Sequence, residues 1–174
     1  MTNLRNRYFL PLGIFVLMLL DGAISHVFSP LLYHGQVAII IRLMLLGFVL
    51  AVYALPQEKW LIWYALLIGI LYDSFFTGVI GIYAFILPMV VYLLKVVQPY
   101  LPNAFWSLSL VYVIVAAVFE ICVYAANTMI GLTTVALSTF MVDVLAPTLI
   151  LNLVIFFILA VPLTRLLVRI EVEE

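Results

Sequence analysis

Long apolar runs separated by short turns dominate this sequence and limit the folds open to it. Hydrophobic residues make up 68% of the 174 positions and charged residues only 9%, whereas soluble domains carry about 25% charged residues. A chain with so little polar surface is expected to lie in a lipid bilayer. The apolar runs are continuous, so they predict membrane helices.

Six of these apolar segments are long enough to cross the ~30 Å hydrocarbon core of a bilayer as α-helices. No soluble domain, linker or internal repeat interrupts them, and residues 1–174 are expected to form a single integral membrane domain. The fold class predicted is therefore an all-α polytopic membrane protein. The predicted transmembrane spans are 8–28, 37–55, 59–76, 79–97, 104–127 and 139–163.

The basic residues predict the orientation of the chain. Six of the seven Lys and Arg residues fall at alternate ends of the predicted spans, and the positive-inside rule places such ends in the cytoplasm. Both termini are then cytoplasmic. The first span is expected to stay in place as a helix, because it is too long for a signal peptide and contains Asp21. The residues that set this orientation are Arg5, Arg7, Lys59, Lys95, Arg165 and Arg169.

Five ionisable residues lie inside the predicted spans, although a charge at the bilayer centre costs roughly 2.5–3.5 kcal/mol on insertion scales. In the predicted topology all five fall in the outer half of the membrane, which predicts a polar cluster. One arginine cannot pair with four acids. The alternatives are a packing role, a binding cavity for a substrate or ion, and a surface for a partner's membrane helix. These residues are Asp21, Arg42, Asp73, Glu120 and Asp143.

Asp73 is followed closely by glycines, and Gly69 precedes it on the same helical stripe. Gly78 can adopt positive φ and so permit a tight reversal between the third and fourth spans. Gly81 is expected to admit another backbone near the start of the next helix. Asp73 is then placed to accept backbone N–H groups at that helix start, as a buried cap does.

Two prolines inside predicted spans are expected to kink their helices. Pro88 leaves the carbonyl group of Ala84 without a partner, and Pro147 does the same to Asp143. The second kink would place a free acceptor beside a carboxylate.

The sequence favours a protein that is not an enzyme and needs no metal or cofactor. Catalytic signatures such as HExxH, GxSxG and phosphate-binding glycine loops are missing, and Cys122 is the only cysteine. Asp73 and Asp143 could form the carboxylate pair of an intramembrane protease, but the glycines expected before the second aspartate are lacking. The net charge of −1 gives no support for nucleic-acid binding.

The stretch "GILYDSFFTGVIGIYAFILPMVVYLLK", residues 69–95, resembles the MreD family of rod shape-determining proteins, in particular its members from Gram-positive bacteria. The motif residues that carry the resemblance are Gly69, Asp73, Gly78 and Gly81. The resemblance implies a multi-pass protein of the bacterial plasma membrane. It also implies a non-enzymatic scaffold of the cell-wall elongation machinery, which supports peptidoglycan synthesis and cell shape.

The resemblance further implies the partners of such a scaffold. These are MreC, which has a single membrane span, a RodA-type SEDS glycosyltransferase and a class B penicillin-binding protein, with RodZ and MreB where they are present. The layout also resembles the S components of energy-coupling-factor vitamin transporters, six-helix proteins with a pocket open to the outside. A substrate-binding subunit for vitamin uptake is therefore the alternative function.

Overall fold

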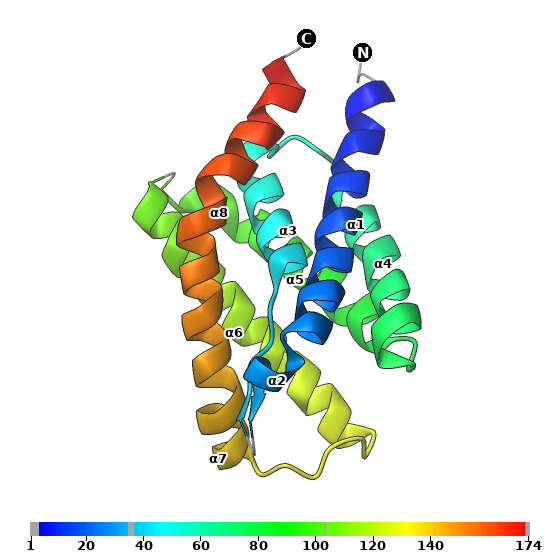
Figure 1. The fold of residues 1–174 in the computed structure, drawn as a ribbon. Helices are drawn as coiled ribbons and strands as arrows, with labels where there is room; N and C mark the ends of the chain where they lie inside the picture. The colour runs from blue at the N-terminus through cyan, green and yellow to red at the C-terminus, as the bar shows by residue number, and fades with distance from the viewer. Residues whose placement is uncertain (1–3, 35–36, 103, 173–174) are drawn as a thin grey trace.

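The computed structural model describes residues 4–34, 37–102 and 104–172, which form a helical bundle. α1 begins and α8 ends at the same end of the molecule, as Figure 1 shows. Within the described ranges, the body of the bundle consists of α1 (Leu4–Val27), α3 (Leu43–Ala54), α4 (Leu61–Tyr72), α5 (Ile82–Val97), α6 (Phe105–Met129) and α8 (Ala146–Val172).

Short elements connect or extend these helices. β1 and β2 form a two-residue antiparallel ladder with Tyr33 opposite Ala38, so strands contribute a small hairpin and no layer. Two π-helical turns, η1 after α4 and η3 before α8, widen the helices that contain them. The short elements are α2 (Ser29–Leu32), β1 (Tyr33–His34), β2 (Val37–Ala38), η1 (Asp73–Thr77), η2 (Gln98–Tyr100), α7 (Leu137–Thr139) and η3 (Phe140–Leu145).

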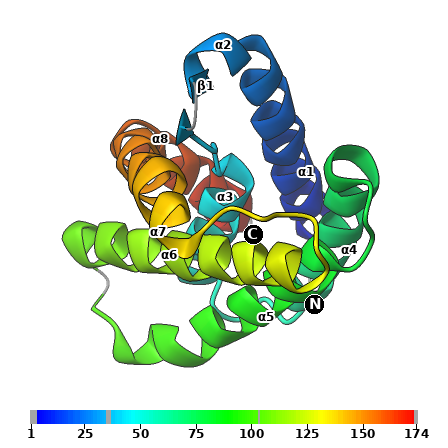
Figure 2. The same ribbon diagram turned by 90° about the horizontal axis from the view of Figure 1, so that it is seen from below.

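α3 is the central helix of the bundle. It packs against α1, α4, α5, α6 and α8, and Figure 2 shows it among these helices. Its residues from Leu43 to Val52 are all buried, whatever face of the helix they occupy. A helix that is apolar all round is expected at such a fully enclosed position.

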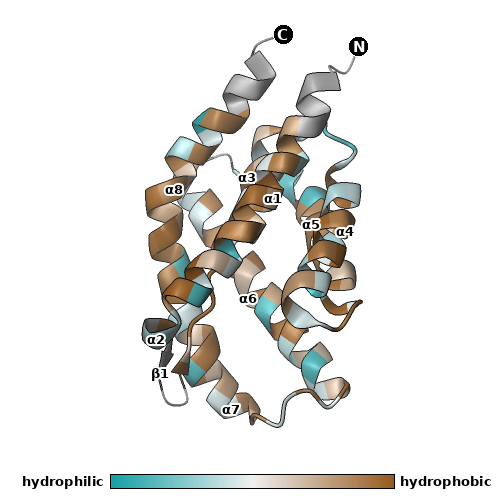
Figure 3. Cartoon of the chain, turned by 45° about the vertical axis from the view of Figure 1, so that its right-hand side comes forward, coloured by the Kyte–Doolittle hydropathy of each residue, from teal (hydrophilic) through white to brown (hydrophobic). Residues whose placement is uncertain are grey.

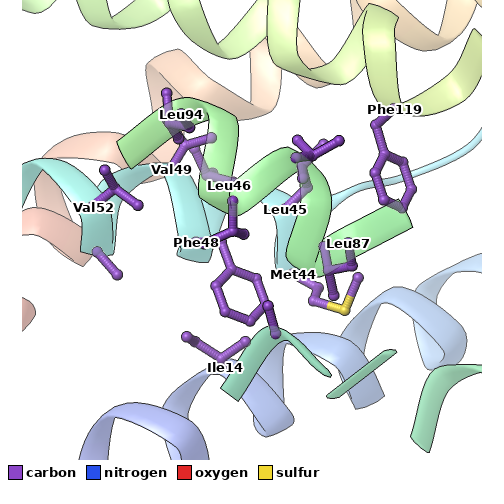
Figure 4. Close-up of a cluster of buried hydrophobic side chains, with 14 of the residues drawn as sticks. Ile14, Met44, Leu45, Leu46, Phe48, Val49, Val52, Leu87, Leu94 and Phe119 are labelled. Atoms are coloured by element: carbon purple, nitrogen blue, oxygen red, sulfur yellow. The ribbon is translucent and has the colours of Figure 1, made fainter. Parts of the chain in front are cut away.

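The core is built around the side chains of α3. Met44, Leu45, Leu46 and Phe48 have no exposed surface, and Figure 4 shows them in one cluster with residues of α1, α5 and α6. The outer faces of the bundle are also apolar, and polar residues occur as isolated positions along the ribbon in Figure 3. Such an exterior suits contact with lipid acyl chains.

Four stretches of helix are long and apolar enough to cross a membrane by length and composition: 9–27, 82–100, 105–129 and 137–167. The two others, Leu43–Ala54 and Leu61–Thr77, are shorter. The all-α class predicted from the sequence is confirmed. The predicted number of six spans stays a prediction for these two segments.

The predicted second span, residues 37–55, is not helical throughout. Val37 and Ala38 belong to β2, residues 39–42 have no regular secondary structure, and the helix begins only at Leu43. The reason is that polar side chains from other helices bond the backbone of this segment, which therefore does not need the hydrogen bonds of a helix.

Candidate functional site

The candidate site is the irregular segment before α3 and the buried polar side chains around it. The amide of Ile40 donates to Thr148 Oγ1 at 3.0 Å, and the amide of Arg42 donates to Asn152 Oδ1 at 2.8 Å. Asn152 also donates through Nδ2 to the carbonyl oxygen of Ile40. Two side chains one turn apart on α8 thus replace the missing helical hydrogen bonds of the segment.

Asp21 of α1 completes the start of α3. Its Oδ1 accepts from the amide of Leu43 at 2.6 Å, and its Oδ2 accepts from the amide of Met44 at 3.0 Å. The residue before α3, Arg42, forms no cap with its own side chain. A carboxylate at a helix N-terminus satisfies orphan N–H groups and complements the helix dipole. Asp21 is therefore a cap supplied by a different helix.

Arg42 and Glu120 form a buried ion pair between the start of α3 and the middle of α6. Arg42 donates through Nε to Glu120 Oε1 and through Nη1 to the hydroxyl oxygen of Tyr72 at 3.3 Å. The guanidinium carbon lies 5.4 Å from the ring centre of Tyr83 and 5.2 Å from that of Phe119. Ring faces at this distance attract a cation. The pair joins α3, α4, α5 and α6.

Tyr112 ties the ion pair to the α8 side of the site. Its hydroxyl group lies 3.2 Å from the carbonyl oxygen of Arg42 and 3.2 Å from Asn152 Oδ1. Tyr112 is fully buried and stacks on Phe156, so its position is fixed by the core. Asp21, Arg42 and Glu120, three of the five predicted cluster residues, are thus brought together with polar residues of α6 and α8.

Asp73 is separate from this group and caps α5. One carboxylate oxygen accepts from the amides of Gly81 at 2.8 Å and Ala84 at 3.1 Å, and the other accepts from the amide of Tyr83 at 3.0 Å. The hydroxyl group of Thr77 is 3.2 Å from the same carboxylate. This is the capping arrangement expected from the sequence. Asp73 is completely buried, so its charge is held by backbone N–H groups.

The glycines around Asp73 have separate roles. Gly78 and Gly81 have φ values of 69° and 125°, which are strained for other residues, and they permit the reversal between η1 and α5. The expected close backbone approach at Gly81 is wrong, because nothing lies within 4 Å of a Cβ there. The approach occurs at Gly69, where a Cβ would lie 2.6 Å from the carbonyl oxygen of Tyr83.

Asp143 is not brought into the polar group. It lies in η3, is partly exposed, and forms no hydrogen bond or ion pair with the described residues. It therefore does not form a shared-proton pair with Asp73, whose oxygens are occupied by the start of α5. Its predicted place in one cluster of five is wrong, because the π turn of η3 leaves it near the end of the bundle, where β2 packs.

The two prolines lie in different surroundings. Pro88 is inside α5, which continues unbroken from Ile82 to Val97. Pro147 is the second residue of α8 and directly follows η3, where the amide of Ala146 donates to the carbonyl of Met141, five residues back. A π turn of this kind is one way for a helix to accommodate a proline.

Three residues of the site were not predicted from the sequence: Tyr112, Thr148 and Asn152. The spacing of two of them does indicate a shared site, since Thr148 and Asn152 are four residues apart in an otherwise apolar helix and therefore lie on one face. Both are almost completely buried. A paired hydroxyl and amide on one buried face indicate a partner with unsatisfied backbone groups.

The chemistry available to these residues is that of holding helices together. Asp21 and Asp73 each bind backbone N–H groups, Glu120 binds Arg42, and all of these side chains are at most 2% exposed. Within the described part of the chain, no group of three or more metal-ligating residues occurs. The fold and the site thus define a helical membrane protein in which buried polar residues fix one broken helix and one tight reversal.

The comparison with known families agrees with this class and makes it specific. The family of the rod shape-determining protein MreD matches residues 4–170, nearly the whole chain. The chain therefore belongs to the MreD family, whose members are structural membrane proteins with a role in rod shape determination. Searches of the curated proteins and of the solved structures gave no significant match.

Proposed function

We propose that this chain is a non-enzymatic membrane scaffold of the cell-wall elongation machinery, and that it binds the single membrane helix of an MreC-like partner. Membership of the MreD family is the observation that carries this proposal. The buried polar residues support it, because their hydrogen bonds go to other groups of the same chain and leave the outer surface apolar. Membrane helices bind one another through such apolar surfaces and through small residues.

The proposed docking surface is the groove between α1 and α8, which is floored by α3. It has a volume of about 470 Å³ and is lined by apolar side chains and two glycines. Gly13 faces open space, with no atom within 4 Å of a Cβ built there. A partner's helix could approach α1 closely at that point. The walls of the groove include Phe9, Leu12, Val16, Gly47, Leu163 and Leu166.

The alternative function, a vitamin-binding S component, requires polar residues that face an open pocket. Arg42, Asp73 and Glu120 are almost fully buried and are bonded to other groups of the protein. They are therefore poorly placed to bind a polar substrate from outside. The scaffold is the function that these contacts support better.

The proposal includes six spans, with both termini in the cytoplasm. α3 is 12 residues long, and such a helix measures about 18 Å. Residues 37–42 add about 20 Å when extended, so 37–54 can cross the bilayer as a broken helix. Non-helical backbone at membrane depth is tolerated where it is buried in protein. The common end of α1 and α8 in Figure 1 fits an even number of crossings.

The test is the substitution Gly13→Leu, assayed by co-purification with an affinity-tagged MreC-like protein from bacterial membranes. The Cβ of the new side chain meets no atom of the fold within 4 Å, and the rest of the side chain occupies the groove that Gly13 lines. We expect recovery of the partner to fall by about tenfold or more, as for the loss of 1.4 kcal/mol or more of binding free energy. Leu110→Trp, on the exposed face of α6, is the matched control and should leave recovery unchanged.

Equal recovery with the Gly13→Leu variant would exclude the groove as the docking surface. Recovery of no MreC-like partner by the unmodified chain would contradict the scaffold proposal itself. Thermal unfolding in detergent separates both results from misfolding. Replacing a helical glycine by leucine without steric conflict should not lower the stability of the protein.

A further inference from the structure

A second cavity lies at the end of the bundle that carries both termini, between the C-terminal end of α3, the start of α6 and the second half of α8. Its volume is about 280 Å³, well above the ~30 Å³ that one water molecule occupies in the liquid. The cavity is therefore large enough for part of an organic ligand. Its lining includes Tyr53, Phe105, Leu108, Val161, Thr164 and Arg165.

Two polar groups of this cavity have no partner among the described residues. The hydroxyl oxygen of Tyr53 is buried and forms no hydrogen bond within the described residues. Arg165 is exposed and forms no ion pair with any described acidic residue. The lining holds no Asp or Glu. Its hydrogen-bonding side chains are the Arg165 guanidinium and the hydroxyl groups of Tyr53 and Thr164. This donor set suits an anion with several acceptor oxygens.

The position of the cavity indicates where that anion comes from. Trp106, next to the lining residue Phe105, is 74% exposed, and Tyr100, six residues before Trp106, is 85% exposed. Exposed tryptophan and tyrosine side chains collect at the level of the lipid head groups. Lys59 and Trp60, in the turn after α3, are exposed at the same end. From these residues we infer that the phosphate groups of the bilayer lie at the height of the cavity mouth.

We propose that this cavity binds a phospholipid with an anionic head group. The head-group phosphate pairs with the Arg165 guanidinium, and a lipid oxygen accepts from the Tyr53 hydroxyl. The apolar walls formed by Phe105, Leu108 and Val161 contact the upper part of the acyl chains. Charge complementarity with Arg165 selects an anionic lipid over a zwitterionic one, whose own cation offsets the phosphate charge. The site does not depend on the docking of a partner in the α1–α8 groove.

The experiment is native mass spectrometry of the full-length protein in detergent, titrated with dioleoyl-phosphatidylglycerol or with dioleoyl-phosphatidylcholine, which has the same acyl chains. We expect the phosphatidylglycerol complex to be about tenfold tighter. Arg165→Gln should remove that preference, because a charge-assisted hydrogen bond is lost. Lys59→Gln, which removes a charge at the same end but outside the cavity, is the control and should keep it.

Thermal unfolding provides a second readout through Tyr53→Phe. Without phosphatidylglycerol, this variant should unfold at or above the temperature of the unmodified protein, because it removes a buried unpaired hydroxyl group. With phosphatidylglycerol it should gain less stability than the unmodified protein. A structural role of the hydroxyl alone would instead lower the stability under both conditions, and that result would contradict the proposal.

Three other results would overturn the proposal. One is equal binding of the two lipids. Another is an equal loss of preference in the Lys59→Gln and Arg165→Gln variants, which would indicate general surface charge. The third is complete displacement of the bound lipid by free glycerol phosphate, at the concentrations at which the lipid itself saturates the site. That result would show that the acyl chains contribute nothing to binding.

Discussion

Arg42, at the start of α3, donates through its Nε to Oε1 of Glu120 in α6, and the two side chains are 1% and 2% exposed. The pair connects the junction between the irregular segment and α3 with α6. Removing one partner would leave the other as a buried, uncompensated charge. The free-energy cost of that charge is larger than the net free energy that the intact pair contributes to stability. The pair is therefore expected to hold the fold in one arrangement.

Replacement of either partner alone should be strongly destabilising. We expect Arg42→Met and Glu120→Leu each to cost about 3–5 kcal/mol of unfolding free energy. The double variant, which has no unpaired charge, should recover most of that loss. Thermal and denaturant unfolding of all four proteins in one detergent measures this. Additive losses in the double variant would show that the two side chains are not coupled.

The Asp73 cap predicts a graded response to substitution. Asp73→Ala leaves the amides of Gly81, Tyr83 and Ala84 without their acceptor, and each unsatisfied buried group costs about 1–3 kcal/mol. Asp73→Asn keeps one acceptor oxygen and should be less damaging, since asparagine is also a good helix cap. Limited proteolysis between η1 and α5, together with unfolding temperatures, checks the order. Equal effects of the two variants would rule out a capping role.

The close approach of α4 and α5 predicts that Gly69 cannot be enlarged. Gly69→Ala would place a Cβ 2.6 Å from the carbonyl oxygen of Tyr83 and 2.8 Å from Ala84 Cα, so the helices must separate. Overpacking of this kind typically costs 1–3 kcal/mol. Gly13→Ala, with open space around it, is the control and should be neutral or stabilising. Similar unfolding temperatures for both variants would disprove the close packing.

The irregular segment before α3 should become exposed when its α8 partner is removed. Asn152→Leu deletes the acceptor of the Arg42 amide and the donor to the Ile40 carbonyl. We expect faster hydrogen exchange of the Arg42 amide and a loss of about 1–3 kcal/mol per unsatisfied group. Ile150→Ala, at an exposed site two residues away, should leave the exchange of the segment unchanged. Unaltered exchange in Asn152→Leu would mean that Asn152 does not support the segment.

The sequence predicts well those features that depend on neighbouring residues. The long apolar runs indicated helices, and helices cover most of each predicted span, with the largest gap over the first six residues of the second. The amides that Asp73 caps lie 8 to 11 residues after it, and Gly78 lies in the reversal itself, so the reversal and its cap could be inferred from spacing. The position of the reversal and of its cap therefore follows from residues that are close in the sequence, without knowledge of the tertiary fold.

The start of α3 could not be placed because the groups that end the irregular segment lie far away in the sequence. Asp21 precedes Leu43, the first residue of α3, by 22 residues, and Asn152 follows Arg42 by 110 residues. Hydropathy alone treats residues 37–42 as helix, since they are almost entirely apolar. The β-branched residues Val37, Ile39, Ile40 and Ile41 carried the opposite signal, because such side chains favour extended backbone.

The single polar cluster was predicted from depth alone, and depth does not set neighbours. Asp21, Arg42 and Glu120 meet because α3 is central and α1 and α6 both pack on it. Asp73 serves α5 instead, and Asp143 stays at the end of the bundle in η3. The order of helices around α3 is a tertiary property that one sequence does not reveal.

The most direct test of the proposed scaffold is affinity purification of the tagged, full-length chain from its native membrane, followed by identification of the bound proteins and small molecules. We expect recovery of an MreC-like single-span protein, together with the RodA-type glycosyltransferase and a class B penicillin-binding protein. Recovery of an ATPase pair and a bound vitamin, without MreC or the wall synthases, would contradict the proposed scaffold.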